Sequence, residues 1–147
     1  MTVRVSVHAR SKRVLIALRN HNTQFDQGIH EALYDIGRIT QTEIRRLLDT
    51  GPKTGRIYSR PGGRRHRASA PGEAPATDTG ALAKSVDYVV QSAIRMEVGD
   101  REHYGEYLED GTRRMRARPH VVRGANNTAG RAVVLLSERV IPRLGIL

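Results

Sequence analysis

The chain has 147 residues, with 25 Lys or Arg against 15 Asp or Glu, a formal net charge of +10 and no cysteine. This length suffices for one domain with a core and is too short for two ordinary domains, so we expect a single domain over residues 1–147. The lack of cysteine excludes disulfides and thiolate metal sites, and with one Phe and no Trp the core must be built from Val, Leu, Ile and Ala.

The N-terminal part carries no sign of export or membrane insertion. The first twenty residues lack the apolar run and cleavage signature of a secretory signal, and no window approaches the roughly 18 apolar residues of a membrane span. We therefore expect a soluble protein made in a cytoplasm. The excess of positive charge is nearly all arginine and predicts a polyanionic partner, and because guanidinium suits phosphate and carboxylate alike, nucleic acid and acidic protein surfaces stay equally open.

Two short elements are predicted before residue 20. Val3, Val5 and Val7 alternate with polar residues, which is the period of a half-buried strand. The apolar run from Val14 to Leu18 is too short for periodicity to decide between strand and helix, and we favour a short helix.

A long amphipathic helix is predicted from Thr23 to a Gly-Pro stop at residues 51–52. Its apolar positions recur every three or four residues and form one stripe: Phe25, Ile29, Ala32, Leu33, Ile36, Thr40, Ile44, Leu47 and Leu48. Gly28 and Gly37 count against the helix, each by on the order of 1 kcal/mol relative to Ala.

Residues 52–76 differ in kind, with four Pro, four Gly, six Lys or Arg and a single acid. This composition supplies no core of its own, so it predicts an extended basic arm or long hairpin that leaves the body. A solvated loop in the isolated monomer is an equal alternative, and the two agree if the arm becomes ordered on assembly.

The rest of the chain alternates short helices and strands. "TGALAKS" suits one or two helical turns, and the alternating runs Val86–Val90 and Ile94–Val98 predict a β-hairpin. "HYGEYLEDGT" predicts a short helix ended by Gly111, and "RRMRARP" an extended link. "NNTAGRAVVLLSERVI" predicts a second amphipathic helix with one face made by Val133, Leu136 and Val140. The fold class is therefore α+β, with the two main helices packed on a small, mostly antiparallel sheet.

The triplet Asp-Thr-Gly, which is the catalytic triplet of aspartic proteases, occurs at residues 49–51 and again at residues 78–80. A proteolytic dyad needs two carboxylates that share a proton, each on a tight turn between apolar strands. Asp49 ends the long helix and Asp78 follows a linker, so neither has that setting. Asp78 or Thr79 instead suits the N-cap of the next helical turn, which predicts a structural turn and no enzyme.

Histidines and acids show no catalytic or metal-binding spacing. The six histidines have no pair at i,i+4 and are expected at the surface or in an interface. The acids around residues 102–110 lie among arginines, so ion pairing is the simpler interpretation. We expect no catalytic residue, no metal and no cofactor.

Three segments follow one another in a recognisable order: "DTGALAKS", "YGEYLEDGT" and, after the link, "ARP". The residues concerned are Asp78, Thr79, Gly80, Leu82 and Ser85, then Tyr104, Gly105, Tyr107, Leu108, Glu109, Gly111 and Thr112, then Ala117, Arg118 and Pro119. Together they resemble the HK97 gp10-like family of tailed bacteriophages, over roughly Thr23 to Leu144. Asp110 and His120 stand where aromatic residues are common in that family.

The resemblance implies a structural virion protein without catalytic activity. Such a protein forms a ring with itself, six-fold or twelve-fold, at the head–tail junction of a long-tailed phage, as a neck or tail-completion component. Its partners are head-closure or connector proteins, the tail terminator or tail tube, and the double-stranded genomic DNA that passes through the lumen, with no membrane involved. The protein is then located in the virion, after assembly in the host cytoplasm, and the structural turns are Asp78, Thr79, Gly80, Gly111 and Pro119.

Two sets of contact residues follow from this expectation. Acids followed closely by bases predict opposite charges on complementary faces of adjacent subunits, with Glu109 or Asp110 pairing with an arginine across the interface. The expected interface residues are Tyr104, Tyr107, Glu109, Asp110, Thr112, Arg113, Arg116 and Arg118. The arm arginines are expected either to line the DNA channel or to bind an acidic neighbouring ring: Arg56, Arg60, Arg64, Arg65 and Arg67.

Two other classes of function stay open at this point. A small, sequence-nonspecific nucleic-acid-binding protein would explain the charge, although Tyr58 is the only aromatic in the arm, which disfavours single-strand binding by stacking. A protease or nuclease is the third possibility, and a metal-dependent nuclease would need clustered acids in a basic cleft.

Overall fold

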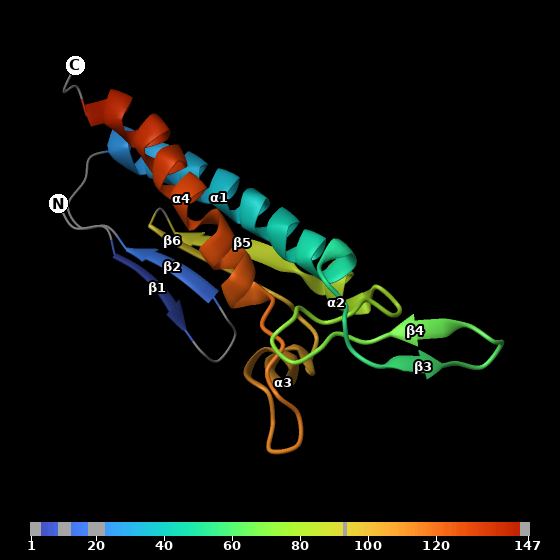
Figure 1. Ribbon diagram of the computed structural model, residues 1–147. Coiled ribbons are helices and arrows are strands. Elements are labelled where there is room, and N and C mark those ends of the chain that lie inside the picture. The colour runs from blue at the N-terminus through green and yellow to red at the C-terminus, as the bar shows by residue number, and fades with distance from the viewer. Residues whose placement is uncertain (1–3, 9–12, 18–22, 93, 145–147) are drawn as a thin grey trace.

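Two long helices and three short β-hairpins make up most of the structure, a computed structural model that describes residues 4–8, 13–17, 23–92 and 94–144. The helices α1 (Thr23–Thr50) and α4 (Val121–Val140) lie side by side in opposite directions (Figure 1). The hairpins join β1 (Arg4–His8) to β2 (Arg13–Ala17), β3 (Ile57–Ser59) to β4 (Arg65–Arg67), and β5 (Asp87–Ser92) to β6 (Arg95–Gly99). Short helices α2 (Ala81–Ser85) and α3 (Gly105–Asp110) and the 3₁₀ turn η1 (Ile141–Leu144) complete an α+β fold, which confirms the predicted class.

The helix α1 confirms the predicted apolar stripe. All nine stripe residues, including Thr40, are buried, and their exposed fractions do not exceed 6%. One side of the stripe packs on α4 and the other on the β5–β6 hairpin, so this helix forms the spine of the core. None of the helices in the described ranges is both long and apolar enough to cross a membrane.

The prediction of a short helix at Val14–Leu18 is wrong. Residues 13–17 form the strand β2, which pairs with β1 in antiparallel register, Val5 opposite Ile16, while Leu18 lies outside the described residues. A run rich in β-branched residues packs well on a pleated surface once a partner strand is available. That partner, and the neighbouring strand β6, decide the conformation of this short run.

The helix α4 begins earlier than predicted, and one of its three predicted inner positions is wrong. It starts at Val121, and its buried face carries Val121, Ala125, Leu135 and Val140, with Leu136 partly buried. Val133 is instead 63% exposed, so its predicted place on the inner face is wrong. The predicted positions Leu136 and Val140 do face the core, and the buried face also continues into the first turns, which the prediction did not include.

The basic segment 52–76 consists of an anchored base and a projecting hairpin. The Glu73 carboxylate accepts hydrogen bonds from the Thr54 hydroxyl at 2.5 Å, from Thr54 N at 2.8 Å and from Ala70 N at 2.7 Å, and these bonds lower the pKa of Glu73 to about 2. Ser69 and Ala74 are buried, so the base of the arm does contribute buried residues, against the expectation from its composition. Beyond this base the strands β3 and β4 extend away from the body (Figure 1).

Two glycines of the long helices sit where another element approaches closely. A Cβ atom added to Gly37 would lie 2.2 Å from Cδ2 of Tyr88 on β5, and one added to Gly124 would lie 2.4 Å from Cγ1 of Ile44. Glycine at these positions allows α1 to contact both β5 and α4. The cost that Gly37 adds to the helix therefore has a packing reason.

We predict that Gly124→Ala destabilises the protein by about 1–3 kcal/mol, because the new methyl group forces α1 and α4 apart. The control is Gly130→Ala in the same helix, where no described atom lies within 4 Å of the added Cβ. That change should be neutral or stabilise by up to about 1 kcal/mol through helix propensity. Urea unfolding measures both, and equal stability of the two variants would contradict the close contact of α1 and α4.

Candidate functional site

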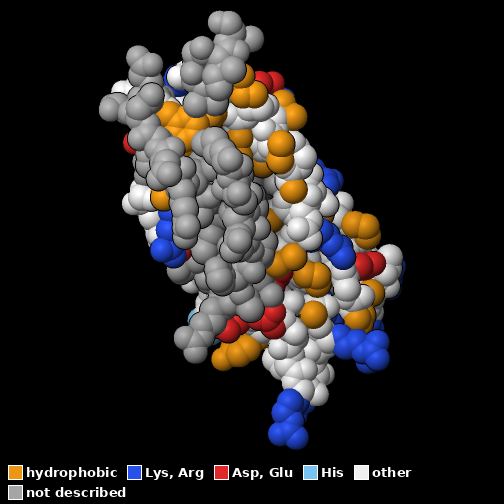
Figure 2. All heavy atoms as spheres, turned by 90° about the vertical axis from the view of Figure 1, so that its left-hand side faces the viewer, with side chains coloured by type: hydrophobic (Ala, Val, Ile, Leu, Met, Phe, Trp, Pro, Cys, Tyr) orange, Lys and Arg blue, Asp and Glu red, His pale blue; other side chains and the backbone are white. Residues whose placement is uncertain are grey.

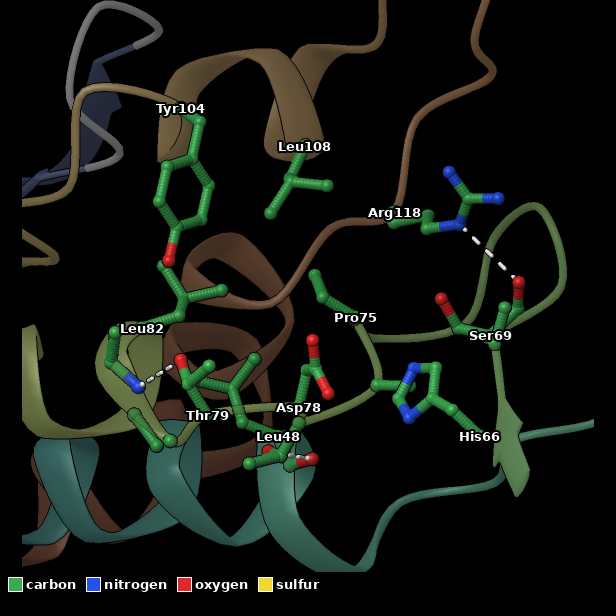
Figure 3. A pocket seen from close by; sticks show the side chains of 16 residues that line it. Leu48, His66, Ser69, Pro75, Asp78, Thr79, Leu82, Tyr104, Leu108 and Arg118 are labelled. Atoms are coloured by element: carbon green, nitrogen blue, oxygen red, sulfur yellow. Dashed lines mark hydrogen bonds between the residues drawn. The ribbon is translucent and has the colours of Figure 1, made fainter. Parts of the chain in front are cut away.

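The three segments that carry the family resemblance meet around one cavity of about 390 Å³. The turn Asp78–Gly80 and Leu82 of α2 form one wall, Tyr104 and Leu108 form another, and Arg118 of the link closes a third side (Figure 3). The base of the arm completes the lining with His66, Ser69 and Pro75, and Leu48 of α1 contributes as well. Residues 40 positions apart in the sequence therefore form one local structure.

The turn at residues 78–80 differs in detail from the predicted cap. The N-cap position of α2 is Gly80, with φ 78°, and Thr79 Oγ1 accepts a hydrogen bond from Ala81 N at 3.3 Å. Asp78 does not cap the helix, so that alternative is wrong; its Oδ2 lies 2.6 Å from a guanidinium nitrogen of Arg60. The carboxylate thus ties the turn to the projecting hairpin.

The two aspartates of the repeated triplet interact with different partners. Thr77 Oγ1 lies 3.1 Å from Asp49 Oδ1, while Asp78 pairs with Arg60. Both aspartates are exposed, and among the described residues no hydrogen bond joins their carboxylates. A shared proton requires direct contact of the two carboxylates in a site that excludes water, and the arrangement provides neither condition.

A buried carboxylate holds the start of α4. Glu109 in α3 is 3% exposed, and its oxygens accept hydrogen bonds from the backbone N–H groups of His120 at 2.7 Å, Val121 at 3.0 Å and Val122 at 3.1 Å. These are N–H groups that the first turn of a helix leaves without an intrahelical partner. The negative charge also lies at the positive end of the helix dipole. Glu109 therefore fixes where α4 begins and how it is oriented.

The side chain of His120 lies between two carboxylates and is fully buried. Its Nε2 lies 3.1 Å from Asp100 Oδ2, and its Nδ1 lies 2.8 Å from Glu109 Oε2 in an electrostatic contact rather than a well-aligned hydrogen bond. Burial by itself would lower the pKa of His120, but the two carboxylates outweigh it and raise that pKa to about 9. Burial would raise the pKa of Glu109, but the imidazolium and the backbone donors lower it to about 2.

This buried cluster corrects two predictions. Glu109 cannot pair with an arginine of an adjacent subunit, because its carboxylate is buried and fully used within its own chain. His120 is not a surface histidine. Asp100 was not predicted at all, and the only signal in the sequence was an acid placed directly after the last strand of a hairpin. In the part of the chain that the structure describes, no group of three or more His, Asp or Glu side chains could hold a metal ion.

The other expected interface residues fall into two groups. Tyr107 is 57% exposed, and Asp110, Thr112, Arg113 and Arg116 are exposed as well. Tyr104 and Arg118 are half-buried and line the cavity, where Arg118 Nε donates to Ser69 O at 3.4 Å. Of the structural turns, Gly111 ends α3 with φ 78° and Pro119 immediately precedes the buried His120.

The five arm arginines are not equivalent. Arg60 pairs with Asp78, and the guanidinium of Arg56 lies over the ring of Tyr58, 5.7 Å from its centroid. Arg64, Arg65 and Arg67 are exposed, and no described carboxylate lies within salt-bridge distance of them. Only these three are therefore free to contact a partner without breaking an existing interaction.

Comparisons of the chain with protein-family models, with curated proteins and with solved structures find no match. The resemblance to phage neck and tail-completion proteins therefore stays a prediction that depends on the residues themselves.

We predict that Glu109→Gln destabilises the protein by about 3 kcal/mol at neutral pH, because it leaves the buried imidazolium with one carboxylate fewer and weakens the cap of α4. The control is Glu106→Gln in the same helix, where the side chain is exposed and the change should cost less than about 0.5 kcal/mol. Chemical unfolding gives both values. A loss at residue 109 no larger than at residue 106 would contradict the structural role of the cluster.

The cluster also predicts a dependence of stability on pH. The pKa of His120 is raised from 6.5 to about 9, so its contribution is complete below about pH 6.5 and is lost as the pH rises through 9. The pKa of Glu109 is lowered from 4.5 to about 2, so its contribution is complete above about pH 4.5 and is lost as the pH falls through 2. The alkaline loss should be on the order of 3 kcal/mol.

The matched variants for this test are His120→Gln and His103→Gln, since His103 is exposed. Between pH 6 and 10, the unfolding free energy of His120→Gln should fall less steeply than that of the wild type. The unfolding free energy of His103→Gln should fall as steeply as that of the wild type. The same alkaline slope in all three proteins would show that His120 is not charged in the folded state.

Proposed function

We propose that the protein is a structural virion subunit of a long-tailed bacteriophage. In this proposal it forms a homo-oligomeric ring at the head–tail junction, joins the tail to the capsid connector, and lets double-stranded DNA pass through its lumen. It acts without catalysis, as a neck or tail-completion component of the virion.

The observation that carries this proposal is the convergence of the three resembling segments. The turn at residues 78–80, the segment 104–112 and the segment 117–119 surround one cavity, and Glu109 links the second to the start of α4. Their polar groups serve as caps, turns and ion pairs, and these are roles that support a scaffold. Residues that act together in one local structure support the interpretation that they form a family motif.

The sheet architecture supports assembly with further copies. The described strands form three separate two-stranded sheets, so each hairpin leaves strand edges without a β-partner. Strand edges without a ladder partner favour pairing with another chain, and repeated heterologous contacts around an axis would cover such edges in every copy. Tyr107, which is 57% exposed on α3 beside Asp110 and Thr112, is the best anchor for such a contact, because tyrosine is common among the residues that dominate interface energies.

A second candidate is a sequence-nonspecific nucleic-acid-binding protein. The exposed, unpaired Arg64, Arg65 and Arg67 on a projecting hairpin favour it. Two properties distinguish it from the ring subunit. It would act as a monomer or dimer, and it would be absent from purified particles.

The assembly experiment mixes the purified protein with the tail tube protein of the same phage and measures mass by analytical ultracentrifugation or native mass spectrometry. We expect a closed ring of defined copy number, and a monomer in isolation is compatible because templating by the tail is common in such systems. No ring with the tail tube, together with absence of the protein from purified particles, would refute the proposal.

The matched interface variants are Tyr107→Ala and Tyr34→Ala, because Tyr34 is also half-exposed, at 49%, but lies on α1. Tyr107→Ala should raise the concentration at which half of the protein is assembled by about tenfold or more, and Tyr34→Ala should leave it nearly unchanged. Equal assembly of both variants would remove α3 from the interface without refuting the ring.

A further inference from the structure

We propose that the β3–β4 hairpin and the turn at residues 112–116 form one cationic surface that binds the phosphate backbone of double-stranded nucleic acid. The inference names a partner contact for the proposed ring and depends on that proposal for its biological setting. The binding itself is a property of the chain and can be measured without any ring.

The first observation is an uneven distribution of ion pairs. Four of the six arginines on the long helices are paired with carboxylates, as in Arg38 with Asp35 at 3.2 Å and Arg46 with Glu43 at 2.7 Å. The other two, Arg45 and Arg123, donate to backbone carbonyls. Six arginines on the two projecting segments are exposed and have no carboxylate within salt-bridge distance among the described residues: Arg64, Arg65, Arg67, Arg113, Arg114 and Arg116. The uncompensated positive charge is therefore concentrated on these two segments.

The second observation is that the two segments are joined. Gly72 N donates to Ala117 O at 2.9 Å, and the guanidinium of Arg118 donates to Ser69 O at 3.4 Å. Arg123 in α4 also donates to Gly72 O. The base of the arm and the link are therefore held to each other by hydrogen bonds. Both segments extend from the end of the molecule where α1 ends and α4 begins, the hairpin to the right and the turn downward in Figure 1.

The third observation is the face of the β3–β4 hairpin on which each side chain lies. Ile57 lies opposite Arg67 and Ser59 opposite Arg65, so these four share one face, while Tyr58 and His66 share the other. His66 lines the cavity against the body, which directs its face inward. Arg65 and Arg67 consequently lie on the outer face. Positive charge is not confined to the hairpin. In Figure 2, Lys and Arg side chains also lie at the tip of the lowest projection, below the acidic side chains of the body.

The chemistry of this surface favours duplex phosphate over the alternatives. Guanidinium groups bind phosphate oxygens in pairs of parallel hydrogen bonds, and contacts to the backbone need no sequence. A single strand would require aromatic stacking platforms, and the only aromatic of the hairpin, Tyr58, lies beneath Arg56. An acidic protein partner would require apolar anchors among the charges, whereas Ile57, at 45% exposed, is the one large aliphatic side chain on the outer face of the hairpin.

The test uses the full-length protein and a fluorescent DNA duplex of about 30 base pairs and random sequence, titrated at salt concentrations from about 50 to about 200 mM. Three triple variants are compared: Arg64, Arg65 and Arg67 to Gln; Arg113, Arg114 and Arg116 to Gln; and the control Arg38, Arg46 and Arg131 to Gln. Each lowers the formal charge of +10 by three, and the control arginines are all ion-paired on the long helices.

The wild type should bind with a slope of log affinity against log salt of about −5, as six phosphate contacts predict. Each cluster variant should reduce that slope by two to three units and weaken binding at low salt by about tenfold or more, while the control changes neither. Thermal melting checks that all variants are folded.

Three results would overturn the inference. Absence of duplex binding at low salt would do so and would leave an acidic protein as the partner. Equal weakening by the control variant would show that net charge alone is responsible. Loss of affinity in only one cluster variant would show that the two segments do not act as one surface.

Ring formation with the tail tube protein is measured on the same variants. A ring without DNA binding refutes this inference alone. DNA binding without a ring supports the inference, and together with absence of the protein from purified particles it refutes the proposed function.

Discussion

The contact of the buried imidazole of His120 with Asp100 and Glu109 fixes the start of α4 relative to the β5–β6 hairpin and α3. It joins the end of β6, the short helix α3 and the first turn of α4 at one point. Loss of one partner of a buried charge pair leaves the other charge uncompensated, which costs about 3–5 kcal/mol. The position of α4 against α1, and hence the core between them, depends on this contact.

Once α4 is fixed, the segments before it are constrained as well. The link to α4 is hydrogen-bonded to the base of the arm through Gly72 and Ala117, and the arm is tied to the turn at residues 78–80 through Arg60 and Asp78. Most polar groups of the resembling segments are therefore used for internal structure. The chemistry left for a partner lies in exposed arginines and in Tyr107, which suits a protein that works through contacts with other macromolecules.

Elements with strong local periodicity were predicted well from the sequence. The stripe of α1, the β5–β6 hairpin and the end of α3 at Gly111 are confirmed, because each depends on residues within a few positions of one another. The short run at residues 13–17 was predicted wrongly, because too few residues were available for periodicity to distinguish a strand from a helix. On α4 the inner positions Leu136 and Val140 were predicted correctly, whereas Val133 is exposed and the buried first turns lay outside the predicted helix.

The sequence by itself therefore determined the fold class, the long helix and the excess of arginine. Only the tertiary structure decided that Glu109 and His120 are buried, that Asp78 binds Arg60 instead of capping a helix, and which arginines stay unpaired. The physical reason is the same in each case. The pKa, burial and partner of a charged group depend on atoms that folding brings close to it. The residues that carry these atoms are far away in the sequence, so no local sequence pattern indicates the contact.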